Sequence, residues 1–188
     1  MVQTFKVRKR APRRIEIFVD RVEQLFNSMD PSPFHEKDLD HDAEEFITSW
    51  AQEFTASDPL ALIVHVSRPI APPNSFEAVE AAVRHYFSYR AKLNQLELKR
   101  LLKRGRISLI IGLLFLGACL LIRESVLPQQ SGTLFRLLRE SLTIAGWVAM
   151  WRPMQIFLYD WWPLRRLGRI YQNLSRMPVE LRVTGQPR

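Results

Sequence analysis

Residues 30–45 contain the strongest candidates for a metal-binding or other functional site in this sequence. Two histidines and a run of aspartates and glutamates crowd this segment. Carboxylates and imidazoles are ligands of divalent cations, so the segment could form a metal site. The spacing matches no EF-hand, because no glycine occupies the turn, and the chain has no HExxH or CxxC motif. The candidate metal ligands are His35, Asp38, His41 and Asp42.

The same segment has a simpler interpretation as the capped beginning of a helix. Asp42 and Glu45 have the spacing of a capping box, and acidic side chains in a first helical turn favour the helix dipole. The carboxylates would then face water or a basic partner. We predict this partner-facing surface and keep metal binding as the alternative function. The partner-facing residues are Asp30, Glu36, Asp38, Asp40, Asp42 and Glu44.

The rest of the chain carries no pattern typical of a catalytic or cofactor site. It has no Ser/His/Asp arrangement, nucleophile elbow, Walker loop or GxGxxG motif, and its seven glycines are not clustered. His65 lies in an apolar segment, which is typical of a core histidine, and His85 beside Arg84 is typical of a surface residue. We therefore predict that the protein is not an enzyme and holds no cofactor.

Strand patterns occur at three places in the chain. Residues 14–19 alternate apolar and polar side chains, and so do residues 177–183. Residues 60–66, LALIVHV, form a nearly continuous apolar run, which is typical of a strand covered on both faces. We predict two or three strands in one small sheet.

Helix patterns separate the predicted strands. One helix begins near Asp42, and Phe46, Ile47, Trp50 and Phe54 form its predicted buried face. A second begins near residue 76 and continues without a proline into an apolar run, over about 45 residues. The order of strands and helices predicts the α/β class, a small α/β sandwich with two helices and an inserted helical hairpin.

Residues 107–122, ISLIIGLLFLGACLLI, contain neither charge nor proline. As a helix they would be roughly 24 Å long, and a short extension would reach the ~30 Å of the hydrocarbon layer. A buried core helix is the alternative, but this run, which includes the single cysteine Cys119, is apolar on all sides. We predict a transmembrane helix at about 107–126.

A second span is predicted at about 134–154. Arg123 and Arg139 lie at similar distances from the turn near residue 130, and Arg106 and Arg152 lie at similar larger distances. The four arginines would therefore fall near the two interfaces of a hairpin. In the alternative, a span is centred on Arg152 with Asp160 as its partner, which would make this arginine functional.

Aromatic and basic side chains follow the second span. Four of the five tryptophans and a tyrosine lie within sixteen residues, and such side chains favour the headgroup region. Residues 158–176 are predicted to form an amphipathic helix on the membrane surface. The predicted membrane-interface residues are Arg106, Trp147, Trp151, Arg152, Tyr159, Trp161, Trp162, Arg165 and Arg166.

Charge is distributed unevenly along the chain. The net charge is +8, yet residues 15–60 carry twelve acidic and two basic side chains. Basic blocks at 92–106 and 164–188 adjoin the apolar segments, which is the pattern of cytoplasmic flanks. We therefore predict that both termini are cytoplasmic and that the basic side chains meet anionic headgroups and not nucleic acid.

The strings DPSPFHEKDLD, IAGWVAMWRP and FLYDWWP resemble those of an uncharacterised family of small bacterial two-span membrane proteins. The resemblance implies a bacterial inner membrane and no activity. We predict a non-catalytic anchored module that scaffolds, assembles or regulates a protein partner. The predicted parts are a basic tail (1–14), a cytoplasmic α/β domain (15–104), a transmembrane hairpin (105–157), an interfacial helix (158–176) and a returning strand and tail (177–188).

Overall fold

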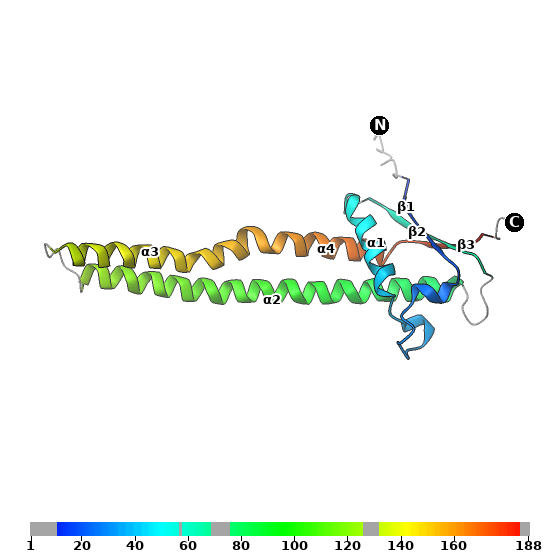
Figure 1. Ribbon diagram of the computed structural model, residues 1–188, viewed down its shortest axis with the longest axis horizontal. Helices are drawn as coiled ribbons and strands as arrows, with labels where there is room; N and C mark the ends of the chain where they lie inside the picture. The colour runs from blue at the N-terminus through cyan, green and yellow to red at the C-terminus, as the bar shows by residue number, and fades with distance from the viewer. Residues whose placement is uncertain (1–10, 57, 69–75, 126–131, 185–188) are drawn as a thin grey trace, which may run out of the picture. The chain divides into compact units, whose positions relative to one another are not determined.

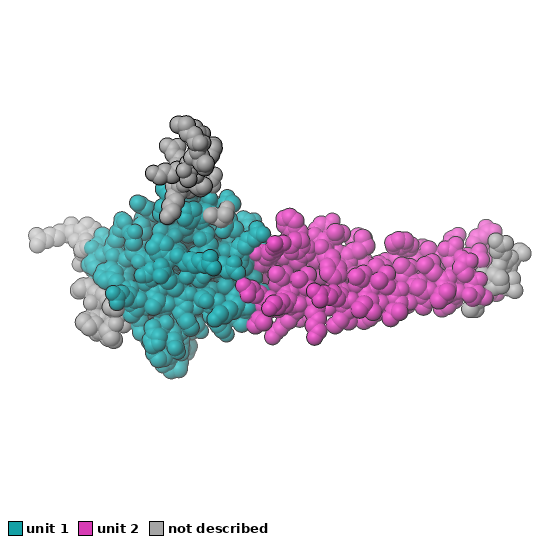
Figure 2. All heavy atoms as spheres, turned by 180° about the vertical axis from the view of Figure 1, so that it is seen from behind, with its two compact units in different colours: residues 1–94, 166–188 teal, residues 95–165 magenta. Residues whose placement is uncertain are grey.

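The computed structural model describes residues 11–56, 58–68, 76–125 and 132–184. The chain divides into two compact units, which Figure 2 shows in different colours. Unit 1 contains residues 1–94 and 166–188, and unit 2 contains residues 95–165. The predicted mixed α/β class is confirmed, since the elements include three strands and long helices.

Unit 1 contains a three-stranded parallel sheet. Strands β1 (Arg13–Val19), β2 (Leu60–Val66) and β3 (Val179–Val183) lie in the order β1-β2-β3. The register pairs Ile15 with Leu62 and Leu62 with Val179. The central strand is the nearly continuous apolar run, as expected for a strand with neighbours on both sides. The predicted third strand therefore joins the sheet although it follows unit 2 in the chain.

Three helices pack on one face of this sheet (Figure 1). They are α1 (His41–Glu53), the first part of α2 (Phe76–Ser125) and the last part of α4 (Trp161–Leu174). The prediction of two helices in this layer is therefore wrong. The segment predicted to lie on the membrane as an amphipathic helix buries part of its apolar face in protein, and those core residues are Ile170, Tyr171 and Leu174.

Helix α1 differs from its prediction at its beginning and on its buried face. The capping residue is Asp40, whose carboxylate accepts a hydrogen bond from the Asp42 N–H, so the predicted capping box of Asp42 and Glu45 is wrong. The core side chains are Ile47, Thr48 and Ala51, while Phe46 and Trp50 are 39 % and 43 % exposed. The small side chains of Thr48 and Ala51 let the helix lie close to its neighbours, which turns both aromatic rings outward.

Unit 2 contains the later part of α2, then α3 (Thr133–Gln155), a π-helical turn η3 (Ile156–Asp160) and the first residues of α4. Pro153 lies inside α3 and removes a backbone donor, and the π-helical turn begins three residues later. Helices α2 and α3 pack closely where glycines lie. A Cβ atom at Gly112 would be 3.2 Å from the Ala149 carbonyl oxygen, and one at Gly146 would be 2.7 Å from Leu116 Cδ1.

Candidate functional site

The apolar surface of unit 2 is the largest feature that the fold leaves without a protein partner. Among the described residues, α2 is the one helix long and apolar enough to cross a membrane, and only 17 % of its most apolar 18-residue window is buried. Soluble monomers rarely expose so large a contiguous apolar area. On α2 the exposed apolar side chains include Ile107, Ile110, Ile111, Leu113, Leu114, Phe115, Leu120, Leu121 and Ile122.

Helix α3 adds an apolar face of its own to unit 2. Ile144, Trp147, Val148 and Trp151 are all exposed, at successive turns of the helix. The opposite side of α3 contacts α2, where Cys119 is buried and lies 3.5 Å, Cβ to Cβ, from a side chain added at Gly146. The cysteine is therefore a small apolar residue at a helix contact, as its position in the apolar run predicts.

The predicted membrane-interface residues of unit 2 are largely exposed. Trp147, Trp151, Tyr159 and Trp162 leave at least 64 % of their surface uncovered. The Trp161 ring differs, because its Nε1 donates to the Phe157 carbonyl oxygen at 2.8 Å and the Arg165 guanidinium lies 5.5 Å from its centre. Arg106 is exposed. Exposed aromatic rings that carry a polar N–H or O–H group are typical of the headgroup region of a membrane.

Arg152 and Asp160 come together in unit 2. Arg152 Nη1 lies 3.8 Å from an Asp160 carboxylate oxygen and 3.2 Å from the Gln155 side-chain oxygen. This is the pair that the alternative interpretation of the second span requires. The Arg152 side chain is 63 % exposed, however, so the pair is not enclosed by protein. Such an exposed, 3.8 Å pair contributes little to stability in water.

Arg166, the last of the predicted interface residues, lies in unit 1. Its Nη2 donates to the Gln52 carbonyl oxygen at 2.9 Å, at the C-terminal end of α1. A guanidinium at this end of a helix satisfies a carbonyl that has no partner within the helix and meets the negative end of the helix dipole. Arg166 therefore has a structural bond that sequence analysis did not predict.

The six predicted partner-facing acids divide into two groups of three. Asp30, Asp40 and Glu44 bond within unit 1. Asp30 accepts hydrogen bonds from the backbone N–H groups of Asp38 at 2.8 Å and Ser32 at 2.9 Å. These bonds lower the pKa of Asp30 below its ordinary value of 3.8, and the bond from Asp38 has the largest effect. Asp30 thus closes the loop that leads into α1.

The other three acids, Glu36, Asp38 and Asp42, have exposed side chains. The Glu36 carboxylate is 3.7 Å from His35, and both side chains are more than half exposed. Within the described part of the chain, no three His, Cys, Asp or Glu side chains converge as ligands of one metal ion. The four candidate ligands therefore lie along one segment without converging.

Glu44 belongs to a partly buried polar cluster that sequence analysis missed. One carboxylate oxygen lies 2.6 Å from Arg90 Nε, and the other accepts a hydrogen bond from the Tyr86 hydroxyl at 2.5 Å. The Arg90 guanidinium also lies 5.5 Å from the Tyr171 ring centre. Burial, and then the Glu44 hydrogen bond, raise the pKa of Tyr86 well above its ordinary value. The cluster joins α1, α2 and α4.

An open cavity of about 390 Å³ adjoins this cluster. Its lining combines acidic, basic and hydroxyl side chains, namely His41, Glu44, Glu45, Thr48, Ser49, Gln52, Arg90 and Tyr171. Glu44 and Arg90 neutralise each other, so neither is a free charge for a ligand. The only sequence signal of the cluster is the four-residue spacing of Tyr86 and Arg90, which places both on one face of α2 but names no partner.

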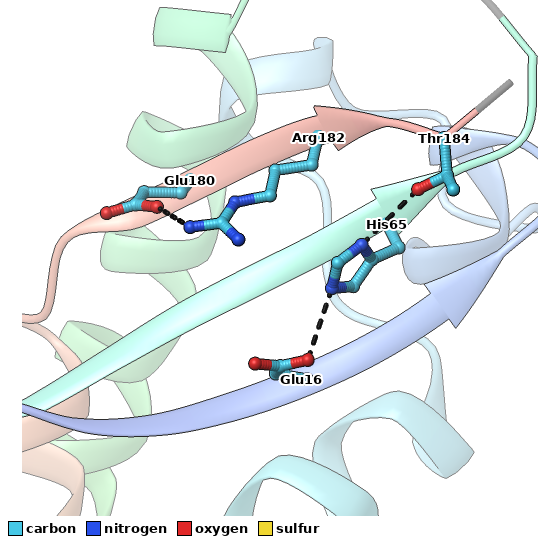
Figure 3. A network of polar contacts seen from close by, with 5 residues as sticks. All are labelled: Glu16, His65, Glu180, Arg182 and Thr184. Atoms are coloured by element: carbon cyan, nitrogen blue, oxygen red, sulfur yellow. Dashed lines mark hydrogen bonds and ion pairs between the residues drawn. The ribbon is translucent and has the colours of Figure 1, made fainter.

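The sheet face opposite the helices carries a polar network (Figure 3). His65 lies between Glu16 Oε2 and Thr184 Oγ1, each 3.3 Å from a ring nitrogen, and its ring stacks on Phe18. The prediction of a core histidine is wrong, because the His65 ring lies on this face and outside the apolar core, where each ring nitrogen has a polar neighbour. Glu180 and Arg182 form a separate pair on the neighbouring strand.

Comparison of the chain with known protein families, with curated proteins and with solved structures finds no match. The resemblance to small two-span membrane proteins therefore stays a prediction.

Proposed function

We propose that this protein is a non-catalytic module of a bacterial inner membrane, which holds an α/β domain at the cytoplasmic face for a protein partner. In this proposal α2 and α3 cross the bilayer as a hairpin and both termini are cytoplasmic.

The exposed apolar surface of α2 is the observation that carries the membrane location. Leu114 is 70 % exposed and Leu121 is 69 % exposed within a helix that bears no charge from Ile107 to Ile122. Removing apolar surface from water stabilises by roughly 25 cal/mol per Å², so these side chains favour transfer into lipid. A water-soluble protein would bury them.

The second span has to include the charges at the beginning of α3. Arg136, Arg139 and Glu140 lower the apolar character of its first turns. Arg123 Nη1 lies 3.5 Å from Thr143 Oγ1, so the end of α2 is a neighbour of the middle of α3. Charged side chains near one end of a span reach the interface, and the residues at 142–150 then lie at the apolar centre of the bilayer.

The partner would meet α1 and the loop before it. Glu36, Asp38 and Asp42 are exposed and acidic, and Phe46 and Trp50 form a ring pair with centres 6.1 Å apart on the outer face of α1. Aromatic side chains surrounded by polar groups are typical of interface hot spots. Acidic residues repel an anionic lipid surface, so a basic protein surface is the fitting occupant.

Membrane fractionation tests the location. The full chain should remain in the pellet after an alkaline carbonate wash, and recovery in the supernatant would contradict the proposal. Topology can be read from cysteines introduced at Gln129 and Gln186 in a Cys119→Ser chain. An impermeant maleimide should label position 129 from outside the cell, whereas labelling of position 186 from outside would reverse the orientation.

Co-purification from native membranes tests the partner. A triple variant, Glu36→Lys, Asp38→Lys and Asp42→Lys, should lose proteins that the unaltered chain retains. The control is Glu77→Lys, Glu97→Lys and Glu180→Lys, which makes the same charge change elsewhere. Equal retention by the unaltered chain and both variants would show that the acidic face of α1 is not the contact.

The alternative of a metal-dependent protein has no supporting contact in the described residues. The candidate ligands His35, Asp38, His41 and Asp42 do not converge there as ligands of one ion. Metal analysis of the purified chain remains the direct test, and stoichiometric metal that is lost in His41→Ala would favour this alternative.

A further inference from the structure

A second cavity of unit 1 lies between the end of α1 and the end of α4. Its volume is about 460 Å³, and its lining residues are Thr55, Ala56, Arg169, Gln172, Asn173 and Arg176. The lining contains two guanidinium groups and no carboxylate. We propose that this cavity binds the phosphate group of an anionic phospholipid.

The two arginines of the cavity lack acidic partners. Arg169 lies in α4 and Arg176 in the turn that follows the end of this helix at Leu174, and both line the cavity. Glu80, Glu44 and Asp20 each pair with another arginine. Within the ranges that the structure describes, neither Arg169 nor Arg176 forms an ion pair. The cavity therefore has a positive charge that an anion would offset.

Hydrogen bonds hold one wall of the cavity in place. Asn173 Nδ2 donates to the Asp58 carbonyl oxygen at 2.6 Å and to that of Ala56 at 3.5 Å. Arg166 Nη2 donates to the Gln52 carbonyl oxygen. These bonds attach the end of α1 and the residues that follow it to α4. A wall that is already ordered reduces the entropy lost when a ligand binds.

The chemistry of the lining fits a phosphate group. Guanidinium groups bind phosphate oxygens through paired, charge-assisted hydrogen bonds, and Gln172 and Thr55 can donate further ones. A divalent cation is disfavoured by two positive side chains. A purely apolar ligand would leave them unpaired.

The position of the arginines in the chain favours a lipid as the source of the phosphate. Arg169 follows Trp162 by seven residues in the sequence of α4. Trp162 is exposed and is a predicted headgroup residue. This step rests on the proposed membrane location, since only there do anionic headgroups lie within reach.

The test compares lipid binding by two charge-matched variants of the full chain. Purified protein in detergent is titrated with phosphatidylglycerol or phosphatidylcholine, and binding is followed by the rise in the thermal unfolding midpoint. We expect phosphatidylglycerol to bind the unaltered chain more tightly. Arg169→Gln with Arg176→Gln should weaken its binding about tenfold or more, as expected for the loss of a charged hydrogen bond.

Arg14→Gln with Arg182→Gln is the control, because it removes two positive charges from the sheet face opposite the helices and should keep the binding. If both variants lose the same amount of phosphatidylglycerol binding, the effect depends on net charge alone and the proposal is overturned. Unchanged binding in the Arg169/Arg176 variant would also overturn it. Inorganic phosphate and a short RNA are tested on the unaltered chain at the same phosphate concentration as the lipid. If either raises the unfolding midpoint as much as phosphatidylglycerol does, the assignment to lipid is overturned.

Fractionation separates this proposal from the one on which it rests. The Arg169/Arg176 variant should stay in the carbonate-washed pellet, because the spans and not the cavity hold the chain in the bilayer. Loss of lipid selectivity with unchanged membrane retention supports the cavity. Recovery of the unaltered chain in the supernatant would instead reject the membrane location.

Discussion

Apolar side chains have opposite surroundings in the two units of this chain. In unit 1, Leu62 and Phe87 are completely buried beneath the helices of the α/β layer. In unit 2, Leu114 and Phe115 belong to the same continuous helix as Phe87, yet about half or more of each side chain is uncovered. Residue type is therefore no guide to burial in this molecule.

The difference is the one that the proposed membrane location predicts. The core of unit 1 is completed by its own elements, so water is a suitable exterior. The glycine contact between α2 and α3 buries only one side of each helix, and the other side retains an apolar surface. Close packing at small residues is how helices associate when lipid covers their outer faces.

Phe87→Ala and Phe115→Ala test this comparison most strongly, because they remove the same ring from one helix. Phe87→Ala leaves a cavity in the core of unit 1 and should lower its free energy of unfolding by about 3–5 kcal/mol. Phe115→Ala should change it by less than about 1 kcal/mol, since lipid or detergent fills the space. Denaturant unfolding of both purified variants measures the effect. Equal destabilisation would mean that protein covers Phe115.

Leu114→Arg and Leu96→Arg place the same substitution at two positions of α2, one in the apolar run and one in the basic block. An arginine at the centre of a membrane helix costs about 2.5–3.5 kcal/mol in insertion experiments, so Leu114→Arg should reduce the amount of chain in the washed membrane pellet. Leu96 is 47 % exposed and lies in the basic block, where an arginine should change stability by no more than about 0.5 kcal/mol. Immunoblots of the two fractions provide the measurement. Equal amounts of both variants would place Leu114 outside the lipid.

Sequence periodicity was sufficient for the strands and for the long helix. The central strand lies at Leu60–Val66 as predicted, and α2 continues without interruption into the apolar run. Both predictions rest on local properties, namely a continuous apolar run and the absence of proline. The third strand was also visible as an alternating pattern, although its pairing with β2 spans more than a hundred residues.

The errors concern contacts that depend on distant parts of the chain. Phe46 and Ile47 are neighbours about 100° apart on α1, so periodicity alone cannot say which of them faces the sheet. Glu44 belongs to the predicted acidic surface, but its partner Arg90 lies on another helix, 46 residues further along the chain. Nothing local distinguishes a carboxylate that meets water from one that meets a half-buried guanidinium on another helix.

Gly112→Leu and Gly117→Leu test whether the helix contact of unit 2 holds in lipid. A side chain at Gly112 would meet the backbone of Ala149, whereas no atom lies within 4 Å of a Cβ at Gly117. We expect Gly112→Leu to cost about 1–3 kcal/mol as overpacking and Gly117→Leu to have little effect. A thiol-reactive dye that reports exposure of the single cysteine during heating can compare their midpoints. Equal midpoints would exclude a close α2–α3 contact at Gly112.

Asp30→Asn tests a smaller difference, the acid sensitivity of the loop before α1 in unit 1. The pKa of Asp30 in the folded chain is lowered below 3.8, so its carboxylate contributes stability above that pH. The contribution decreases as the pH falls from 3.8 through the lower folded pKa. The variant should therefore lose less stability than the unaltered chain between neutral pH and about pH 2.5.

Asp38→Asn is the control, because it removes a carboxylate from the same loop but keeps the backbone N–H that binds Asp30. Denaturant midpoints at both pH values measure the effect, and identical pH dependence in Asp30→Asn and Asp38→Asn would mean that the two backbone bonds do not hold the loop.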